Sequence, residues 1–134
     1  MQTPLHPLHA VILAGTVPLF LGVLLSDIAY FQTYEVQWKN FASWLIVGGL
    51  SFGGFALLWA LIGFFRGSVR EARKAIHVFL LLAIFVLGFI NALVHAGDAW
   101  ASMPSGLVLS AIVAVLAMIV TGSGFSGTQP GAMR

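Results

Sequence analysis

The sequence predicts an all-α integral membrane protein, a four-helix up-down-up-down bundle with both termini on the cytoplasmic side. Three observations predict it: an apolar composition, four long apolar runs, and an uneven placement of the few basic residues. Hydrophobic residues make up 60% of the 134 residues and charged residues only 7%, whereas a soluble domain carries about 25% charged residues. Such a chain cannot cover its surface with polar groups, so lipid must be its solvent.

Four apolar stretches are long enough to cross a membrane, because a transmembrane helix needs about 20 mostly apolar residues. These predicted spans cover residues 9–30, 41–65, 75–96 and 105–121. The runs do not alternate between apolar and polar residues, which excludes strands. Short connections make consecutive helices antiparallel neighbours. We therefore expect one transmembrane domain over residues 1–121 and a flexible tail over residues 122–134, which is rich in Gly and Ser.

The basic residues are distributed unevenly between the two ends of the predicted bundle. Lys39 alone falls at one end. The other five fall at the end where the chain begins and finishes: Arg66, Arg70, Arg73, Lys74 and Arg134. Because Lys and Arg prefer the cytoplasmic side, we expect a multi-pass protein of the bacterial inner membrane with both termini inside the cell.

The composition also excludes several kinds of chemistry. The chain contains no cysteine, which rules out disulfides, thiolate metal sites, cysteine-ligated iron–sulfur clusters and thioether-attached haem. It carries no nucleotide-binding loop, serine-hydrolase elbow or zinc-protease motif. The sequence therefore offers little to a stand-alone enzyme.

The second span is rich in glycine, at Gly48, Gly49, Gly53 and Gly54. Small residues four positions apart let two helix backbones approach closely. We expect this face to pack inside the bundle. The alternative is a contact with a second copy of the chain or with a partner subunit, so oligomerisation through these glycines stays open.

Polar residues follow one face of the first span and one face of the third. His9 and Asp27 are 18 residues apart, as are His77 and His95, and 18 residues make about five helical turns. Asn91 lies on the same stripe as His95. Both faces should point into the bundle. His9 and His77 should then lie at the same depth, near the cytoplasmic side. Asp27 and His95 should be level near the periplasmic side.

The two histidines near the cytoplasmic side, His9 and His77, are candidate axial ligands of a haem iron, with His6 as the alternative to His9. Two neutral imidazoles on different helices can hold an iron from both sides. Haem b is therefore the cofactor that the pattern suggests. The alternative is that these histidines only hydrogen-bond one another, lipid headgroups or loop carbonyls.

Asp27 and His95 can form a charge-assisted hydrogen bond near the periplasmic side, with Asn91 one turn deeper. Such a pair fixes the first helix to the third, which is the interpretation we prefer. Asp98 is a rival partner for His95. The functional alternative is a proton-accepting group at the edge of a quinone or haem, because histidine titrates near neutral pH.

The run His6-Pro7-Leu8-His9 before an apolar span resembles the start of the bacterial membrane family catalogued as domain of unknown function 2231. The resemblance covers roughly residues 4–96. It continues in residues 25–30 (LSDIAY), in residues 37–45 (QWKNFASWL) with the Gly48-Gly49 pair, and in a basic loop followed by a helix with His77 and Asn91.

The chain departs from the family pattern at Gly15-Thr16, where family members usually carry a Phe-Pro pair; here Pro18 follows two places later. The resemblance implies a four-helix inner-membrane protein without assigned chemistry. Some relatives are fused or adjacent to Rieske-type or other redox modules, which implies a place in respiratory or redox membranes.

The function we expect is that of a small inner-membrane redox component, either a b-type haem protein or the membrane partner of an electron-transfer enzyme. The alternative is a non-catalytic accessory subunit or anchor of a larger membrane complex. A third option is a proton or small-solute pathway along the two polar faces. It needs oligomers, because four helices leave little room for a pore.

Overall fold

A computed structural model describes residues 6–67, 72–97 and 103–126 of the chain. These residues form four helices: α1 (Pro7–Thr33), α2 (Val36–Arg66), α3 (Ala72–His95) and α4 (Ser105–Ser126). They contain no strand. Each helix is long and apolar enough to cross a membrane. The prediction of an all-α bundle of four membrane-spanning helices is therefore confirmed.

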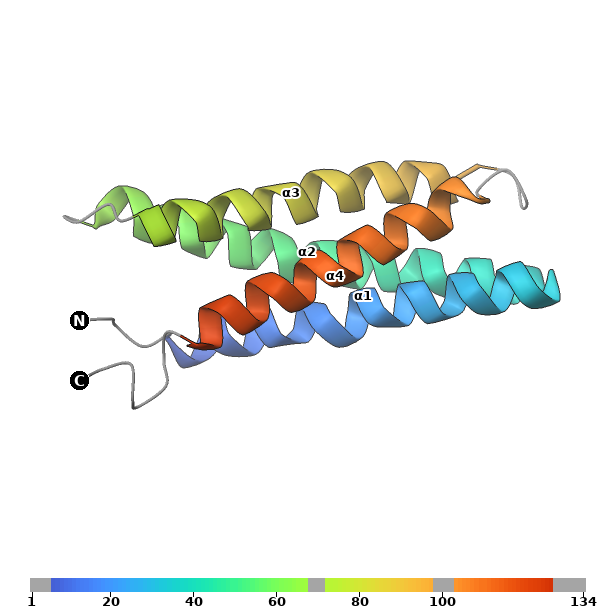
Figure 1. Ribbon diagram of the computed structural model, residues 1–134, viewed down its shortest axis with the longest axis horizontal. Helices are drawn as coiled ribbons and strands as arrows, with labels where there is room; N and C mark the ends of the chain where they lie inside the picture. Colours follow the sequence, from blue (N-terminus) through green and yellow to red (C-terminus); the bar gives the residue numbers. More distant parts are fainter. Residues whose placement is uncertain (1–5, 68–71, 98–102, 127–134) are drawn as a thin grey trace.

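The helices run alternately up and down, so the start of α1 and the finish of α4 lie at the same end of the bundle (Figure 1). Each helix packs against the next one in the chain, and α4 closes the bundle against α1. The pair α1 and α3 therefore lies across the diagonal of the bundle, as does the pair α2 and α4. Which side of the membrane each end faces stays a prediction.

The two ends of the bundle differ in charge and in how the chain turns, and we call them the basic end and the turn end. The basic end holds the start of α1 and carries Arg66, Arg73 and Lys74 at the adjoining ends of α2 and α3. The turn end lies opposite and holds the tight connection from α1 to α2. There Tyr34 takes a left-handed conformation (φ 60°), and its backbone N–H donates to the carbonyl of Tyr30 at 2.8 Å. This closes α1 with a common type of helix C-cap.

The helices are longer than the apolar runs that predicted them. Only Tyr34 and Glu35 separate α1 from α2, in place of the expected connection over residues 31–40. At the other end of the chain α4 continues to Ser126, so the first residues of the expected tail are helical; residues 127–134 lie outside the described part. Hydropathy marks the apolar layer of the membrane, whereas a helix continues beyond that layer into the interface.

An apolar core fills the middle of the bundle. Leu13, Leu81, Ile84, Ala117 and Val120 are all at most 1% exposed and belong to one packed cluster. This cluster draws on all four helices, since it also includes Ala56 and Leu57 of α2. It separates the two ends of the bundle by a layer of tightly packed hydrocarbon.

The glycines of α2 let the neighbouring helices approach this core. A Cβ atom on Gly49 would lie 2.6 Å from the Phe20 ring of α1, and one on Gly48 would lie 3.3 Å from Leu19. Gly53 and Gly54 instead meet Ile84 and Phe85 of α3, at 3.9 and 3.1 Å. All four glycines thus face other helices of the same chain, and the approach at Gly48, Gly49 and Gly54 is closer than an ordinary Cβ contact. Oligomerisation through them stays a prediction.

Candidate functional site

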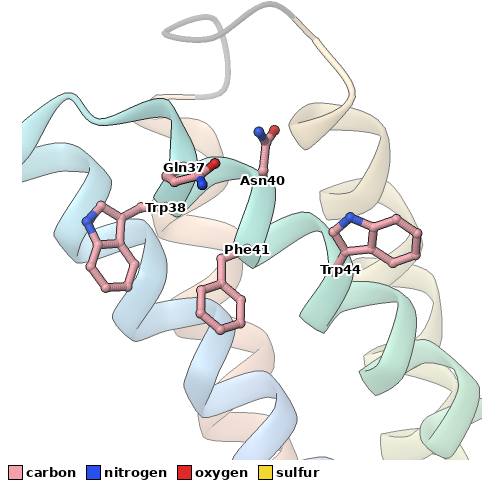
Figure 2. A pocket seen from close by; sticks show the side chains of 5 residues that line it. All are labelled: Gln37, Trp38, Asn40, Phe41 and Trp44. Atoms are coloured by element: carbon pink, nitrogen blue, oxygen red, sulfur yellow. The ribbon is translucent and has the colours of Figure 1, made fainter.

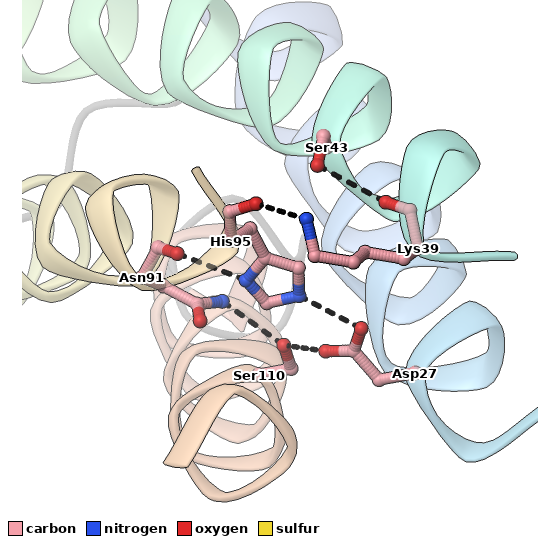
Figure 3. A network of polar contacts seen from close by, with 6 residues as sticks. All are labelled: Asp27, Lys39, Ser43, Asn91, His95 and Ser110. Carbon is pink, nitrogen blue, oxygen red and sulfur yellow. Dashed lines mark hydrogen bonds and ion pairs between the residues drawn. The ribbon is translucent and has the colours of Figure 1, made fainter. Parts of the chain in front are cut away.

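The polar contact between α1 and α3 crosses the diagonal of the bundle at the turn end (Figure 3). Asp27 Oδ1 lies 2.8 Å from His95 Nε2, and the two side chains are 0% and 1% exposed. His95 Nδ1 lies 2.9 Å from the backbone oxygen of Asn91. Both ring nitrogens therefore face oxygen atoms, with Nε2 toward the carboxylate and Nδ1 toward a backbone carbonyl.

Ser110 of α4 extends this contact to a third helix. Its hydroxyl donates to Asp27 Oδ2 and accepts a hydrogen bond from Asn91 Nδ2 at 2.9 Å. The hydroxyl proton is therefore held by the carboxylate and not by the imidazole of His95. In a serine-hydrolase triad the serine gives its proton to the histidine, so this Ser, His and Asp set does not have the geometry of a hydrolase site.

Lys39 of α2 brings in the fourth helix. Its side chain is 8% exposed, and Nζ donates to the backbone oxygen of His95 at 2.6 Å. The last carbonyls of a helix lack intrahelical partners and carry the negative end of the helix dipole. Since His95 is the last residue of α3, the ammonium group caps that helix. We call Asp27, Lys39, Asn91, His95 and Ser110 the turn-end network.

Two members of this network were not among the residues predicted from the sequence. The predicted spans place Lys39 in the connection between the first two helices, and no role is predicted for Ser110 from the sequence. Helical spacing contains the signal for both. Lys39 begins an inward stripe of α2 that continues through Ala42 and Ile46, and Ser110 lies on a stripe of α4 with Ala117. Asp98, the rival partner for His95, lies outside the described residues.

His9 and His77 approach each other at the basic end, with ring centroids 5.8 Å apart and ring planes at 70°. Trp59 of α2 stacks on the His9 ring at 5.8 Å and lies 5.0 Å from the His6 ring. His6 Nδ1 accepts the backbone N–H of Leu8 at 3.1 Å and so caps the start of α1. By contrast, His9 Nδ1 and His77 Nε2 are buried and have no hydrogen-bond partner among the described residues.

A haem iron between His9 and His77 also needs a slot for the macrocycle between α1 and α3. One turn deeper on the same two faces, Leu13 and Leu81 are both 0% exposed and share one packed cluster. Trp59 covers the His9 ring from the side of α2. A flat macrocycle would have to part these contacts, so the packed bundle does not fit a haem at this pair.

A multidentate metal site is not formed by these histidines either. Within the described ranges, no group of three or more His, Asp or Glu side chains is placed to hold a metal ion. His6 therefore does not join His9 and His77 as a third ligand. A metal ion between His9 and His77 would therefore have no third His, Asp or Glu ligand among the described residues.

The part of the bundle between the histidines of the basic end and the turn-end network is mainly apolar. His9 and Asp27 are 18 residues apart, which is about 27 Å along a helix. Within this interval, the hydroxyls of Thr16 and Thr121 both donate to the backbone oxygen of Leu13, at 2.7 and 3.2 Å. The surrounding core side chains are hydrocarbon. In the part of the chain that the structure describes, no continuous line of polar groups joins the two ends for a proton or solute to follow.

An open hollow of about 520 Å³ lies on α2 near the turn end (Figure 2). It is lined by Gln37, Trp38, Asn40, Phe41 and Trp44, and the rings of Trp38 and Phe41 stack 6.3 Å apart. Aromatic side chains are typical of the level where a helix leaves the hydrocarbon layer. This surface therefore suits contact with lipid headgroups, and its lining carries no titratable side chain.

The closed bundle and its buried polar contacts define a multi-pass membrane protein built from four helices. Residues 5–130 match the family described as predicted membrane protein (DUF2231), and the chain belongs to this family. The match extends the resemblance seen in the sequence through the whole of α4. No curated protein and no solved structure matches the chain.

Proposed function

We propose that the protein is a non-catalytic accessory subunit or anchor of a larger complex in the bacterial inner membrane. The turn-end network is the observation that supports this proposal. In it, the Ser110 hydroxyl donates to Asp27, both nitrogens of His95 face oxygens, and Lys39 caps α3. A buried network that joins all four helices stabilises a single arrangement of those helices, with Asn91 Oδ1 as its one buried side-chain atom that has no hydrogen-bond partner among the described residues.

The small share of the described residues that lies outside the helices agrees with this role. The described residues are almost entirely membrane-spanning helices, so the contacts available to a partner lie mainly on the lipid-facing sides. Large side chains are exposed there on every helix, among them Leu25, Trp44, Phe79 and Val115. An electron-transfer enzyme is the class of partner that the family resemblance suggests.

Site-specific photocrosslinking in native membranes tests the proposal. A photoreactive amino acid is placed at Leu25, Trp44, Phe79 or Val115, one exposed position on each helix. We expect protein adducts from positions on one side of the bundle and lipid adducts from the others, which then serve as internal controls. The crosslinked partner should also co-purify at constant stoichiometry. Lipid adducts alone at all four positions, with a lone monomer after mild extraction, would contradict an accessory role.

A further inference from the structure

We propose that His9 and His77 bind one first-row transition-metal ion between α1 and α3 at the basic end. The observation is that His9 Nδ1 and His77 Nε2 are buried without a hydrogen-bond partner among the described residues, on rings 5.8 Å apart. The His9 side chain is only 4% exposed. Buried polar atoms in native proteins nearly always have a partner. The third such side-chain atom among the described residues, Asn91 Oδ1, belongs to the turn-end network, whereas these two stand on neighbouring rings that one ligand can join.

The spacing of the rings fits a single ion. With metal–nitrogen bonds of about 2.1 Å, two imidazoles on one ion have ring centroids at most about 6.4 Å apart. The observed 5.8 Å is within this limit and corresponds to a bent arrangement around the ion. A bare ion also leaves the packing of Leu13 and Leu81 below it intact, which a macrocycle does not.

The chemistry of the two ligands indicates which ions bind. Imidazole nitrogen suits copper, nickel and zinc, whereas magnesium prefers oxygen ligands. For divalent ions at one site, affinity rises toward Cu²⁺ and falls again at Zn²⁺. Arg73 lies one turn before His77 on α3, and its positive charge opposes a cation. With only two protein ligands, the remaining coordination positions go to water, so binding should be exchangeable.

Metal titration of the full-length protein in detergent tests this inference. We expect one equivalent of Cu²⁺ to bind per chain, with Ni²⁺ and Zn²⁺ weaker and no response to Mg²⁺. Because an ion that binds only the folded state stabilises it, Cu²⁺ should also raise the unfolding temperature. The electron paramagnetic resonance spectrum of the Cu²⁺ complex should show coupling to two imidazole nitrogens.

Matched variants locate the site. His9→Gln and His77→Gln should each lower Cu²⁺ affinity at least tenfold. His6→Gln should leave it unchanged, because His6 does not form a three-ligand group with His9 and His77. Where a variant folds poorly, the wild-type spectrum shows by its nitrogen couplings whether two imidazoles bind the Cu²⁺ ion. Cu²⁺ binding that survives in the His9→Gln/His77→Gln double variant would overturn the inference, as would a lack of saturable binding. A haem absorption band in the purified protein would overturn it too, because the bundle would then open for a macrocycle.

Discussion

Asp27 holds the central position in the turn-end network, because its two carboxylate oxygens contact residues of two other helices. Oδ1 contacts His95 of α3 and Oδ2 accepts from Ser110 of α4. An ionisable side chain inside a membrane-spanning helix is unfavourable unless it has partners. The contacts with His95 and Ser110 offset this cost, and they do so only when the helices are assembled.

The first prediction concerns this carboxylate. Asp27→Asn keeps an oxygen for Ser110 but removes the charge that faces His95. We expect the free energy of unfolding to fall by about 1–3 kcal/mol, between the small values for polar contacts in membranes and the larger values for broken buried ion pairs. The measurement is equilibrium unfolding in mixed micelles.

The chain provides a matched control for Asp27→Asn. Glu35 is exposed and makes no side-chain cap bond at the start of α2, so Glu35→Gln should leave the unfolding curve unchanged. His95→Gln combined with Asp27→Asn should cost less than the sum of the two single changes, because both remove the same interaction. Strict additivity would show that the ion pair contributes nothing of its own.

The packing of adjacent helices depends on small residues as much as on hydrogen-bonded ones. Phe20 of α1 lies against Gly49 of α2, and its ring occupies the position that a larger residue would need. Leu50 of α2 in turn lies against Gly88 of α3, where a Cβ would be 2.9 Å from the leucine. The spacing between adjacent helices is therefore set by glycines on alternate partners.

The second prediction tests this packing. Gly49→Ala places a Cβ 2.6 Å from the Phe20 ring, and we expect it to destabilise the bundle by about 1–3 kcal/mol, as overpacking of a core does. Gly63→Ala is the control, since a Cβ there meets nothing within 4 Å. It should be neutral or stabilising by up to about 1 kcal/mol, because alanine is the better helix former. Equal unfolding midpoints for the two variants would contradict this account.

The elements show what a sequence can predict in such a protein. Four spans follow from hydropathy, and the spacing of 18 residues put Asp27 and His95 on facing stripes. The start of α2 was missed because Val36–Asn40 is too polar to register as a span, and Lys39 was missed with it. Ser110 could not be assigned to Asp27 from sequence, because the contact depends on how α4 is rotated about its own axis. Rotation is set by packing with its neighbours, which hydropathy does not report.

At the scale of the whole molecule, the orientation in the membrane is the third prediction. Glu35 lies at the turn end and Gly67 at the basic end. The native chain has no cysteine, so Glu35→Cys and Gly67→Cys give single labelling sites without background. In intact spheroplasts an impermeant maleimide should label only Glu35→Cys, because the basic end is expected to face the cytoplasm. After membrane disruption both variants should react. Labelling of Gly67→Cys alone in intact cells would reverse the orientation.

The contribution of Ser110 has a consequence for biosynthesis. The ribosome makes α4 after the other three helices. Those three therefore enter the bilayer with Asp27, Lys39, Asn91 and His95 but without the hydroxyl that joins Asp27 to Asn91. Until α4 arrives, Asp27 Oδ2 and Asn91 Nδ2 lack the partner that they have in the four-helix bundle, and an unbonded polar group is unfavourable in hydrocarbon. Arrival of α4 supplies both bonds at once. A chain truncated before α4 therefore keeps two polar atoms without their partners. Membrane proteases that remove unassembled helices should degrade it faster than the chain that includes α4.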